Sequence, residues 1–218
     1  MVHLAILVIL SIFMATPSPA QPTRDQALIA AAGKGDAAAV ERLIGEGASV
    51  TARDARGRTA LLAATHGNHV AAARALIAAG ADVNAKDDIE DSAFLYAGAE
   101  GRTEILKMTL PKADLKSTNR YGGTALIPAA HHGHPEAVRI LLGTAIDKDH
   151  VNKLGWTALL EAVILGDGGA THTDIVRLLV EAGANVNLPD RDGVTPLAHA
   201  KRRGFAEMVR ILEARGGR

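Results

Sequence analysis

The strongest constraint on the fold is an internal repeat of about 33 residues. Thr59, Ser92, Thr124 and Thr157 open four similar segments and are separated by 33, 32 and 33 residues. A further copy, GVTPLAHAKRRGF, begins at Gly193, and residues 28–53 match the unit without its leading turn. A unit this short cannot bury its own apolar face, so the repeat predicts a stack of neighbouring units with a shared core.

Each unit has the pattern of two helices. The Thr or Ser hydroxyl can cap the first helix, and a following Gly, or Asn68 in one copy, can end it in the left-handed backbone conformation. A second, amphipathic helix follows, as in Val138, Leu141 and Leu142 at helical spacing, and we expect Leu141 to lie in the continuous core. A turn rich in Gly, Asn and Asp leads to the next unit, so the pattern predicts an all-α fold.

The repeated motif TALxxAA…GH…LL..GADVN resembles that of the ankyrin repeat family, and the resemblance covers residues 25–218. The segment 157–204, which begins TALLEAVILGDGG and ends TPLAHAKRRG, is similar to exported bacterial ankyrin proteins in particular. The resemblance implies antiparallel helix pairs, hairpin-like turns and a curved solenoid with a concave binding face. We expect six repeats, near 25–53, 54–86, 87–118, 119–153, 154–189 and 190–218.

Two repeats depart from the family pattern. Repeat three contains Pro111 in LPKADL, which predicts a shortened or kinked second helix. Repeat five carries about five extra residues within 166–173. We expect these extra residues to form a longer, mobile loop between the two helices of repeat five.

The N-terminus has the layout of a secretory signal peptide. An apolar run, Leu4 to Ala15, is followed by Pro17 and Pro19, and Ser18 and Ala20 suit the −3 and −1 positions of a cleavage site. The run is short for a membrane span, which needs about 20 residues. We therefore expect a signal peptide at 1–20, cleavage after Ala20, a domain at 21–218 and a periplasmic location. The alternative is an uncleaved N-terminal membrane anchor, since the segment before the run has no Lys or Arg.

Composition argues against several classes of function. The chain has 24 basic and 24 acidic residues and only 3% aromatic residues, so it lacks the basic excess and the stacking platforms of a nucleic-acid binder. It has no cysteine, which excludes thiolate catalysis and cysteine-bound zinc. No nucleophile motif or acid/base pair is recognisable, so we expect no enzyme activity and no cofactor.

The cluster HHGH holds His131, His132 and His134. In the repeat register His134 matches His69, and both are expected to satisfy backbone groups between helices. His131 and His132 point about 100° apart on a helix and cannot easily chelate one ion. The alternative is a periplasmic metal- or small-ligand-binding protein that uses His131, His132 or His172 and the loop of repeat five.

The remaining candidates are surface side chains on the turns and first helices, where ankyrin repeats typically contact partners. They predict a non-catalytic, monomeric adaptor that binds another protein and, after signal removal, neither nucleic acid nor membrane. Glu161 and His199 are expected to face the same groove, too far apart for a direct hydrogen bond. The predicted contact residues are Ile89, Tyr96, Glu100, Arg120, Tyr121, His131, His132, Lys153, Leu154, Trp156, Glu161 and His199.

Overall fold

The computed structural model describes residues 22–218, which form twelve α-helices in stacked pairs and no β-strand. The predicted signal peptide and its cleavage site lie outside these residues. The first helices of the pairs are α1 (Arg24–Lys34), α3 (Ala60–His66), α5 (Ala93–Ala99), α7 (Leu126–His131), α9 (Ala158–Ile164) and α11 (Pro196–Arg202). The second helices are α2 (Ala37–Gly45), α4 (Val70–Ala78), α6 (Thr103–Thr109), α8 (Pro135–Leu142), α10 (Ala170–Glu181) and α12 (Ala206–Glu213).

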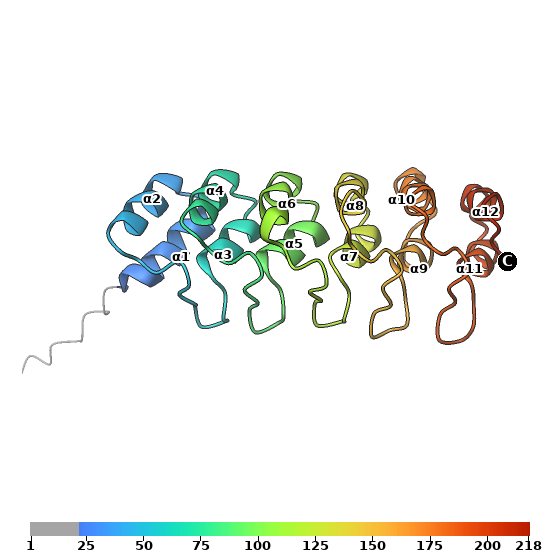
Figure 1. Ribbon diagram of the computed structural model, residues 1–218, viewed down its shortest axis with the longest axis horizontal. Helices are drawn as coiled ribbons and strands as arrows, with labels where there is room; N and C mark the ends of the chain where they lie inside the picture. Colours follow the sequence, from blue (N-terminus) through green and yellow to red (C-terminus); the bar gives the residue numbers. More distant parts are fainter. Residues whose placement is uncertain (1–21) are drawn as a thin grey trace, which may run out of the picture.

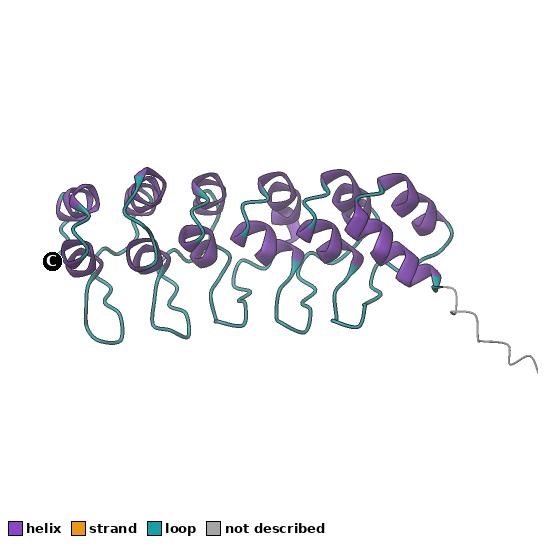
Figure 2. Ribbon diagram, turned by 180° about the vertical axis from the view of Figure 1, so that it is seen from behind, coloured by secondary structure: helices purple, strands orange, loops and turns teal. Residues whose placement is uncertain are grey.

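The helices form two rows, with the first helices in one row and the second helices in the other (Figure 1). The loops that precede the first helices from α3 onward project together on one side of the stack (Figure 2). Each first helix packs against the second helix of its own pair and against the first helices of neighbouring pairs. None of the helices in residues 22–218 has the length and hydropathy of a membrane-spanning segment.

One continuous core runs between the two rows. It consists mainly of Leu, Ile, Val and Ala, and the alanines allow the helices of adjacent repeats to approach closely. Leu141 on α8 and Phe94 on α5 are fully buried. The prediction that Leu141 lies in the core is confirmed.

Most first helices begin and end as their sequence predicts. The Oγ1 atom of Thr59 accepts the N–H of Leu62 at 3.2 Å, and Ser92, Thr157 and Thr195 cap their helices in the same way. Asn68 has φ 54° after α3, and Gly133 has φ 78° after α7. These left-handed residues turn the chain sharply into the second helix.

Repeat four is the exception to this capping pattern. Thr124 is buried, but its Oγ1 has no hydrogen-bond partner, and α7 begins only at Leu126. Pro128 has no backbone N–H and so cannot donate to the Thr124 carbonyl, which instead accepts the N–H of Ile127 at 3.1 Å. The expectation that the repeat threonine caps the first helix is therefore wrong in this repeat.

The two irregular repeats differ in how far they follow prediction. In repeat three, α6 spans only 7 residues and passes into a 3₁₀ turn over Leu110–Lys112, as Pro111 predicts. In repeat five the loop between the helices is longer than in repeat four (165–169 against 132–134), as expected, but it holds only part of the insertion, because α10 begins at Ala170 and spans 12 residues. Asp167 Oδ1 accepts the N–H of Gly169 at 2.9 Å and closes a tight turn, so much of the insertion extends the helix.

Side chains connect successive repeats at the C-terminal ends of the first helices. His69 Nε2 lies 3.1 Å from the carbonyl oxygen of Gly33, two residues before the left-handed Gly35 of the preceding repeat. Three later joints contain a comparable contact, and we call all four contacts the back-bonds. The other three are His132 Nδ1 to Ala99 O (2.9 Å), His172 Nε2 to His131 O (3.0 Å) and Arg203 to Ile164 O and Gly166 O.

The back-bond of repeat four comes from an unexpected residue. By register His134 matches His69, but no hydrogen bond to the His134 ring is found in residues 22–218. The equivalent carbonyl, that of Ala99, already pairs with His132. The structural role predicted for His134 is therefore wrong, and His132, two residues earlier, performs it.

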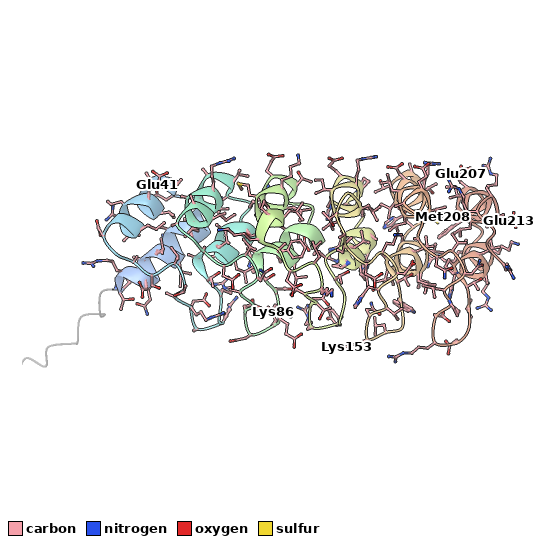
Figure 3. All side chains as sticks on the ribbon, viewed as in Figure 1. Glu41, Lys86, Lys153, Glu207, Met208 and Glu213 are labelled. Carbon is pink, nitrogen blue, oxygen red and sulfur yellow. The ribbon has the colours of Figure 1, made fainter. Side chains whose placement is uncertain are left out.

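The projecting loops are also linked to one another. Lys86 Nζ donates to the carbonyl of Thr118 at 2.6 Å, and Lys153 Nζ donates to the carbonyl of Arg120 at 2.9 Å. Figure 3 shows both lysines in the row of loops. These bonds join three neighbouring loops to one another, and the loops form one wall of the groove described next.

Candidate functional site

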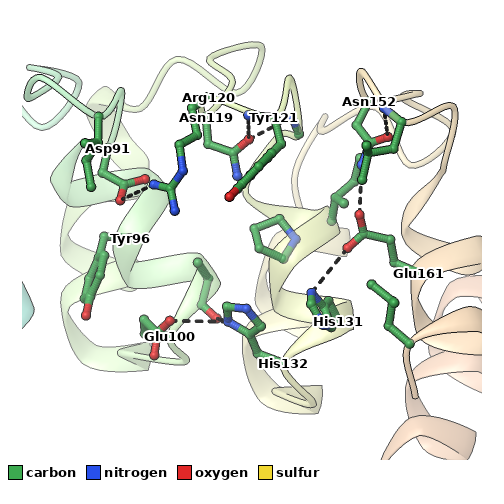
Figure 4. A pocket seen from close by; sticks show the side chains of 17 residues that line it. Asp91, Tyr96, Glu100, Asn119, Arg120, Tyr121, His131, His132, Asn152 and Glu161 are labelled. Carbon is green, nitrogen blue, oxygen red and sulfur yellow. Dashed lines mark hydrogen bonds and ion pairs between the residues drawn. The ribbon is translucent and has the colours of Figure 1, made fainter.

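A groove of about 560 Å³ lies between the first helices α5, α7 and α9 and the loops that precede them (Figure 4). It therefore spans repeats three, four and five. Its lining residues are Ile89, Asp91, Tyr96, Ala99, Glu100, Asn119, Arg120, Tyr121, Gly123, Ile127, Pro128, His131, His132, Asn152, Leu154, Glu161 and Leu165.

Exposed apolar side chains gather at this groove. Five large hydrophobic residues are exposed in residues 22–218, and all but Val151 line it: Ile89, Tyr121, Leu154 and Leu165. Apolar surface that remains in water is stabilised when a partner covers it. This concentration on one hollow surface makes the groove the strongest candidate for a binding site.

Glu161 on α9 is the most unusual group in the groove. Only 5% of the residue is exposed, and its Oε1 accepts the Asn152 Nδ2–H at 2.8 Å. Asn152 is itself fixed, because its Oδ1 accepts the backbone N–H groups of Leu154 and Trp156. Burial disfavours the charged carboxylate and raises the pKa of Glu161 to about 7, although the Asn152 hydrogen bond opposes the rise.

A second acidic group lies at the other end of the groove. Burial raises the pKa of Asp91, and the nearby Asp87 raises it further. Arg120 opposes this rise, with its Nη1 at 3.8 Å from Asp91 Oδ2. The Arg120 guanidinium also lies 4.8 Å from the centre of the Tyr121 ring, in cation–π geometry. Arg120 therefore compensates the charge of Asp91.

The histidines lie between these two acids. His132 Nδ1 is 3.3 Å from Glu100 Oε1 as well as 2.9 Å from the Ala99 carbonyl, which indicates that this nitrogen carries a proton. Burial lowers the pKa of His131, and the adjacent His132 and the nearby His172 lower it further. His131 is therefore largely neutral at pH 7 and does not compensate the charge of Glu161.

One group in the described residues could hold a metal ion. Ligand atoms of Glu100, His132 and His134 all lie within 4.8 Å of one another. This set differs from the predicted one. His172 is occupied on both ring nitrogens, by Asp167 at 3.1 Å and by the carbonyl of His131 at 3.0 Å.

The groove contains nine of the twelve predicted contact residues. Lys153, Trp156 and His199 do not line it. His199 was expected to share the groove with Glu161, but its Nε2 is held by Asp190 Oδ2 at 2.6 Å, one repeat beyond. No direct bond joins Glu161 and His199, as expected. That the nine lining residues bind a partner stays a prediction.

Sequence reasoning missed several lining residues, above all Asn152 and Asp91. The repeat register contained a signal for Asn152. Asn152 and Glu161 are nine residues apart, as are Asp190 and His199 in the next repeat, and both pairs form a hydrogen bond. In repeat three the same positions hold Asp87 and Tyr96, between which no hydrogen bond is found, so the spacing indicates such a contact only in repeats five and six.

Comparison with known proteins agrees with the stacked helix pairs. The family model for ankyrin repeats, described as three copies, matches residues 4–87, 94–190 and 147–216. The chain belongs to the ankyrin repeat family. An ankyrin repeat domain is typically a non-catalytic scaffold that binds proteins, and the matched family model contains no catalytic domain.

Bacterial ankyrin proteins are among the similar chains. An ankyrin repeat domain from Acinetobacter baumannii AYE, ABAYE2397, is 54% identical with a TM-score of 0.85, over 88% of this chain and 98% of that one. The ankyrin repeat protein YahD of Escherichia coli K12 is 43% identical over 125 residues. That match covers 56% of this chain and 62% of YahD, so the chain spans less than two thirds of that relative.

A third similarity concerns the fold alone. It is to a structure of the predatory endopeptidase Bd0816 from Bdellovibrio bacteriovorus in complex with the immunity protein Bd3460. The identity is 22% and the TM-score is 0.73, over 87% of this chain and 97% of the matched chain.

Proposed function

We propose that the protein is an exported, non-catalytic adaptor that binds a partner protein in the groove between α5, α7 and α9. The observation that carries the proposal is the concentration of exposed apolar side chains in one preformed hollow. Hydrogen bonds already fix the loops and helices around the groove, so binding would order few additional groups. Large aromatic side chains such as that of Tyr121 commonly anchor such interfaces.

Two further observations support parts of the proposal. Export rests on the apolar run, the prolines and the small residues at the N-terminus of the sequence. Partner binding is in keeping with the family, and the structure that matches at 22% identity is itself a complex of two proteins. We propose a monomer and no cofactor, because the groove is complete within one chain.

Affinity capture from a periplasmic extract tests this function. The baits are the full chain, a groove variant with Tyr121→Ala and Leu154→Ala, and a control variant. The control carries Lys107→Ala and Arg139→Ala, both in the row of second helices. All four side chains are exposed, so each variant is expected to fold. A protein held by the wild type and the control but lost by the groove variant would support the proposal. Equal recovery on all three baits would contradict it.

A second candidate function is binding of a divalent transition metal by Glu100, His132 and His134. Two imidazoles and a carboxylate suit Zn²⁺, and the bond from His132 Nδ1 to the Ala99 carbonyl leaves Nε2 as the ligand atom. Calorimetric titration with Zn²⁺ tests it. One ion should bind to the wild type and to His131→Ala and not to His134→Ala. Equal binding by His134→Ala would remove this candidate.

A further inference from the structure

The carboxylate of Glu161 has one free oxygen facing the groove. Asn152 occupies Oε1, whereas no hydrogen bond to Oε2 is found in residues 22–218, and His131 Nδ1 lies 3.7 Å from it, beyond hydrogen-bond length. Figure 4 shows Glu161 between Asn152 and His131 at one end of the groove. In residues 22–218, no Lys or Arg nitrogen lies within 4.0 Å of this carboxylate. A carboxylate this deeply buried normally has such a partner, because burial without one is costly.

The scaffold does not require an acid at this place. The same register position holds Ala63, Tyr96, Pro128 and His199 in the other repeats. All of these repeats form a helix pair, although Pro128 shortens α7, so the helix pair does not require an acid at position 161. The acid is therefore specific to the repeat that closes one end of the groove.

Glu161 is the one fully buried acid of the groove lining, and it has no Lys or Arg nitrogen beside it. Arg120 lies beside Asp91, and His132 lies beside Glu100. The groove lining contains three acidic residues and a single Arg or Lys, which is Arg120. The free oxygen of Glu161 thus marks the point where a positive charge is favoured.

The surroundings of this oxygen also suit a long aliphatic chain with a charged end. Leu154, Leu165 and Ile127 line the same groove as Glu161, as does Tyr121 on the loop before α7. Lys and Arg side chains pack their methylene groups on apolar surface and place the charged end on an acceptor. An acidic or purely apolar side chain would leave the carboxylate unpaired.

We propose that the groove recognises a partner segment that inserts a lysine or arginine side chain against Glu161, with apolar residues beside it on Tyr121 and Leu154. The inference rests on the proposed adaptor function and names the chemistry of the partner. The cation forms a charge-assisted hydrogen bond to Oε2, to which no group in residues 22–218 donates.

Selection of random linear peptides, displayed on phage, against the immobilised full chain tests the inference. The enriched peptides should share a Lys or Arg next to apolar residues. A synthetic copy of the best peptide should bind Glu161→Gln about tenfold or more weakly than the wild type. Gln keeps the shape and the acceptor for Asn152, so the variant is expected to fold. Glu181→Gln is the matched control. Glu181 is exposed on the second helix α10, and this substitution also replaces one carboxylate by an amide.

A double-mutant cycle assigns the contact. Replacing the basic residue of the peptide by Gln should weaken binding to the wild type and have little effect on binding to Glu161→Gln. Enriched peptides that lack a basic residue, that are acidic, or that bind Glu161→Gln as tightly as the wild type would overturn the inference, as would a library without enrichment. None of these results decides the adaptor function, which the capture experiment tests independently.

Discussion

At the scale of the residue, Glu161 has a measurable effect on stability. Burial raises its pKa from 4.5 to about 7, so the native state favours the protonated acid. Protonated Glu161 therefore contributes fully to the free energy of unfolding below the unfolded-state pKa. This contribution is lost as the pH rises through about 7. At 1.36 kcal/mol per pH unit, the loss is roughly 3 kcal/mol.

Glu161→Gln should therefore stabilise the protein in a pH-dependent manner. We expect its free energy of unfolding to exceed that of the wild type by about 1–3 kcal/mol near pH 8 and the difference to shrink near pH 4. Urea unfolding of both proteins across this range measures it. A variant that is less stable than the wild type at every pH would show that the charged carboxylate supports the fold.

Leu141 is the corresponding test of the core. It is fully buried on α8, so Leu141→Ala should leave a cavity and cost roughly 2–5 kcal/mol. Leu154→Ala removes the same side chain from the groove, where it is 48% exposed, and should change stability by less than about 1 kcal/mol. Similar losses for the two variants, measured by urea unfolding, would show that Leu141 is not a core residue.

At the scale of the helix, repeat four shows what one proline changes. Pro128→Ala restores an N–H that can donate to the Thr124 carbonyl, so α7 should begin earlier and Thr124 should cap it. We expect a gain of about 1 kcal/mol in the free energy of unfolding. Pro135→Ala is the control, because Pro135 is the first residue of α8, where an N–H has no helical partner. Equal effects of the two substitutions would contradict this account.

The helices also show which features were predictable from sequence. The helix pairs follow from Thr or Ser at one end and Gly or Asn at the other, because capping depends on a few neighbouring atoms. The deviations depend on contacts between repeats or on a missing N–H. His132 rather than His134 pairs with Ala99, and the insertion lengthens α10, since Asp167 closes the turn before it.

The sequence predicted many of the residues that line the groove, but not the hydrogen bonds and charge states of their side chains. Tyr121, Leu154 and Glu161 are identified by their places on turns and first helices. The hydrogen bond from Asn152 and the burial of Glu161 require a loop packed against a helix nine residues away along the chain. The charge state of Glu161 follows from that packing and has no signature in the local sequence.

At the scale of the whole molecule, a stack of repeats has no contacts between distant units, so its ends should open first. In residues 22–218, α11 and α12 have neighbours on one side only, whereas α7 and α8 have neighbours on both. Amide hydrogen exchange, followed by mass spectrometry, should be faster in the last pair than in the central pair. Leu212→Ala should accelerate exchange in the last pair alone. Uniform protection along the chain would indicate unfolding as a single unit.

The back-bonds also determine how the stack responds to force. At four joints they tie the C-terminal end of a first helix to the next repeat, but in the described residues the joint between repeats two and three has none. There Arg102 occupies the position of His69, and its Nε is buried without a partner. Seen as an elastic rod, the molecule lacks this tie at the joint next to the groove, so we expect the ends of the first helices to resist bending less there than at the other joints. Bending there would widen or narrow one end of the groove without disturbing Glu161 at the other.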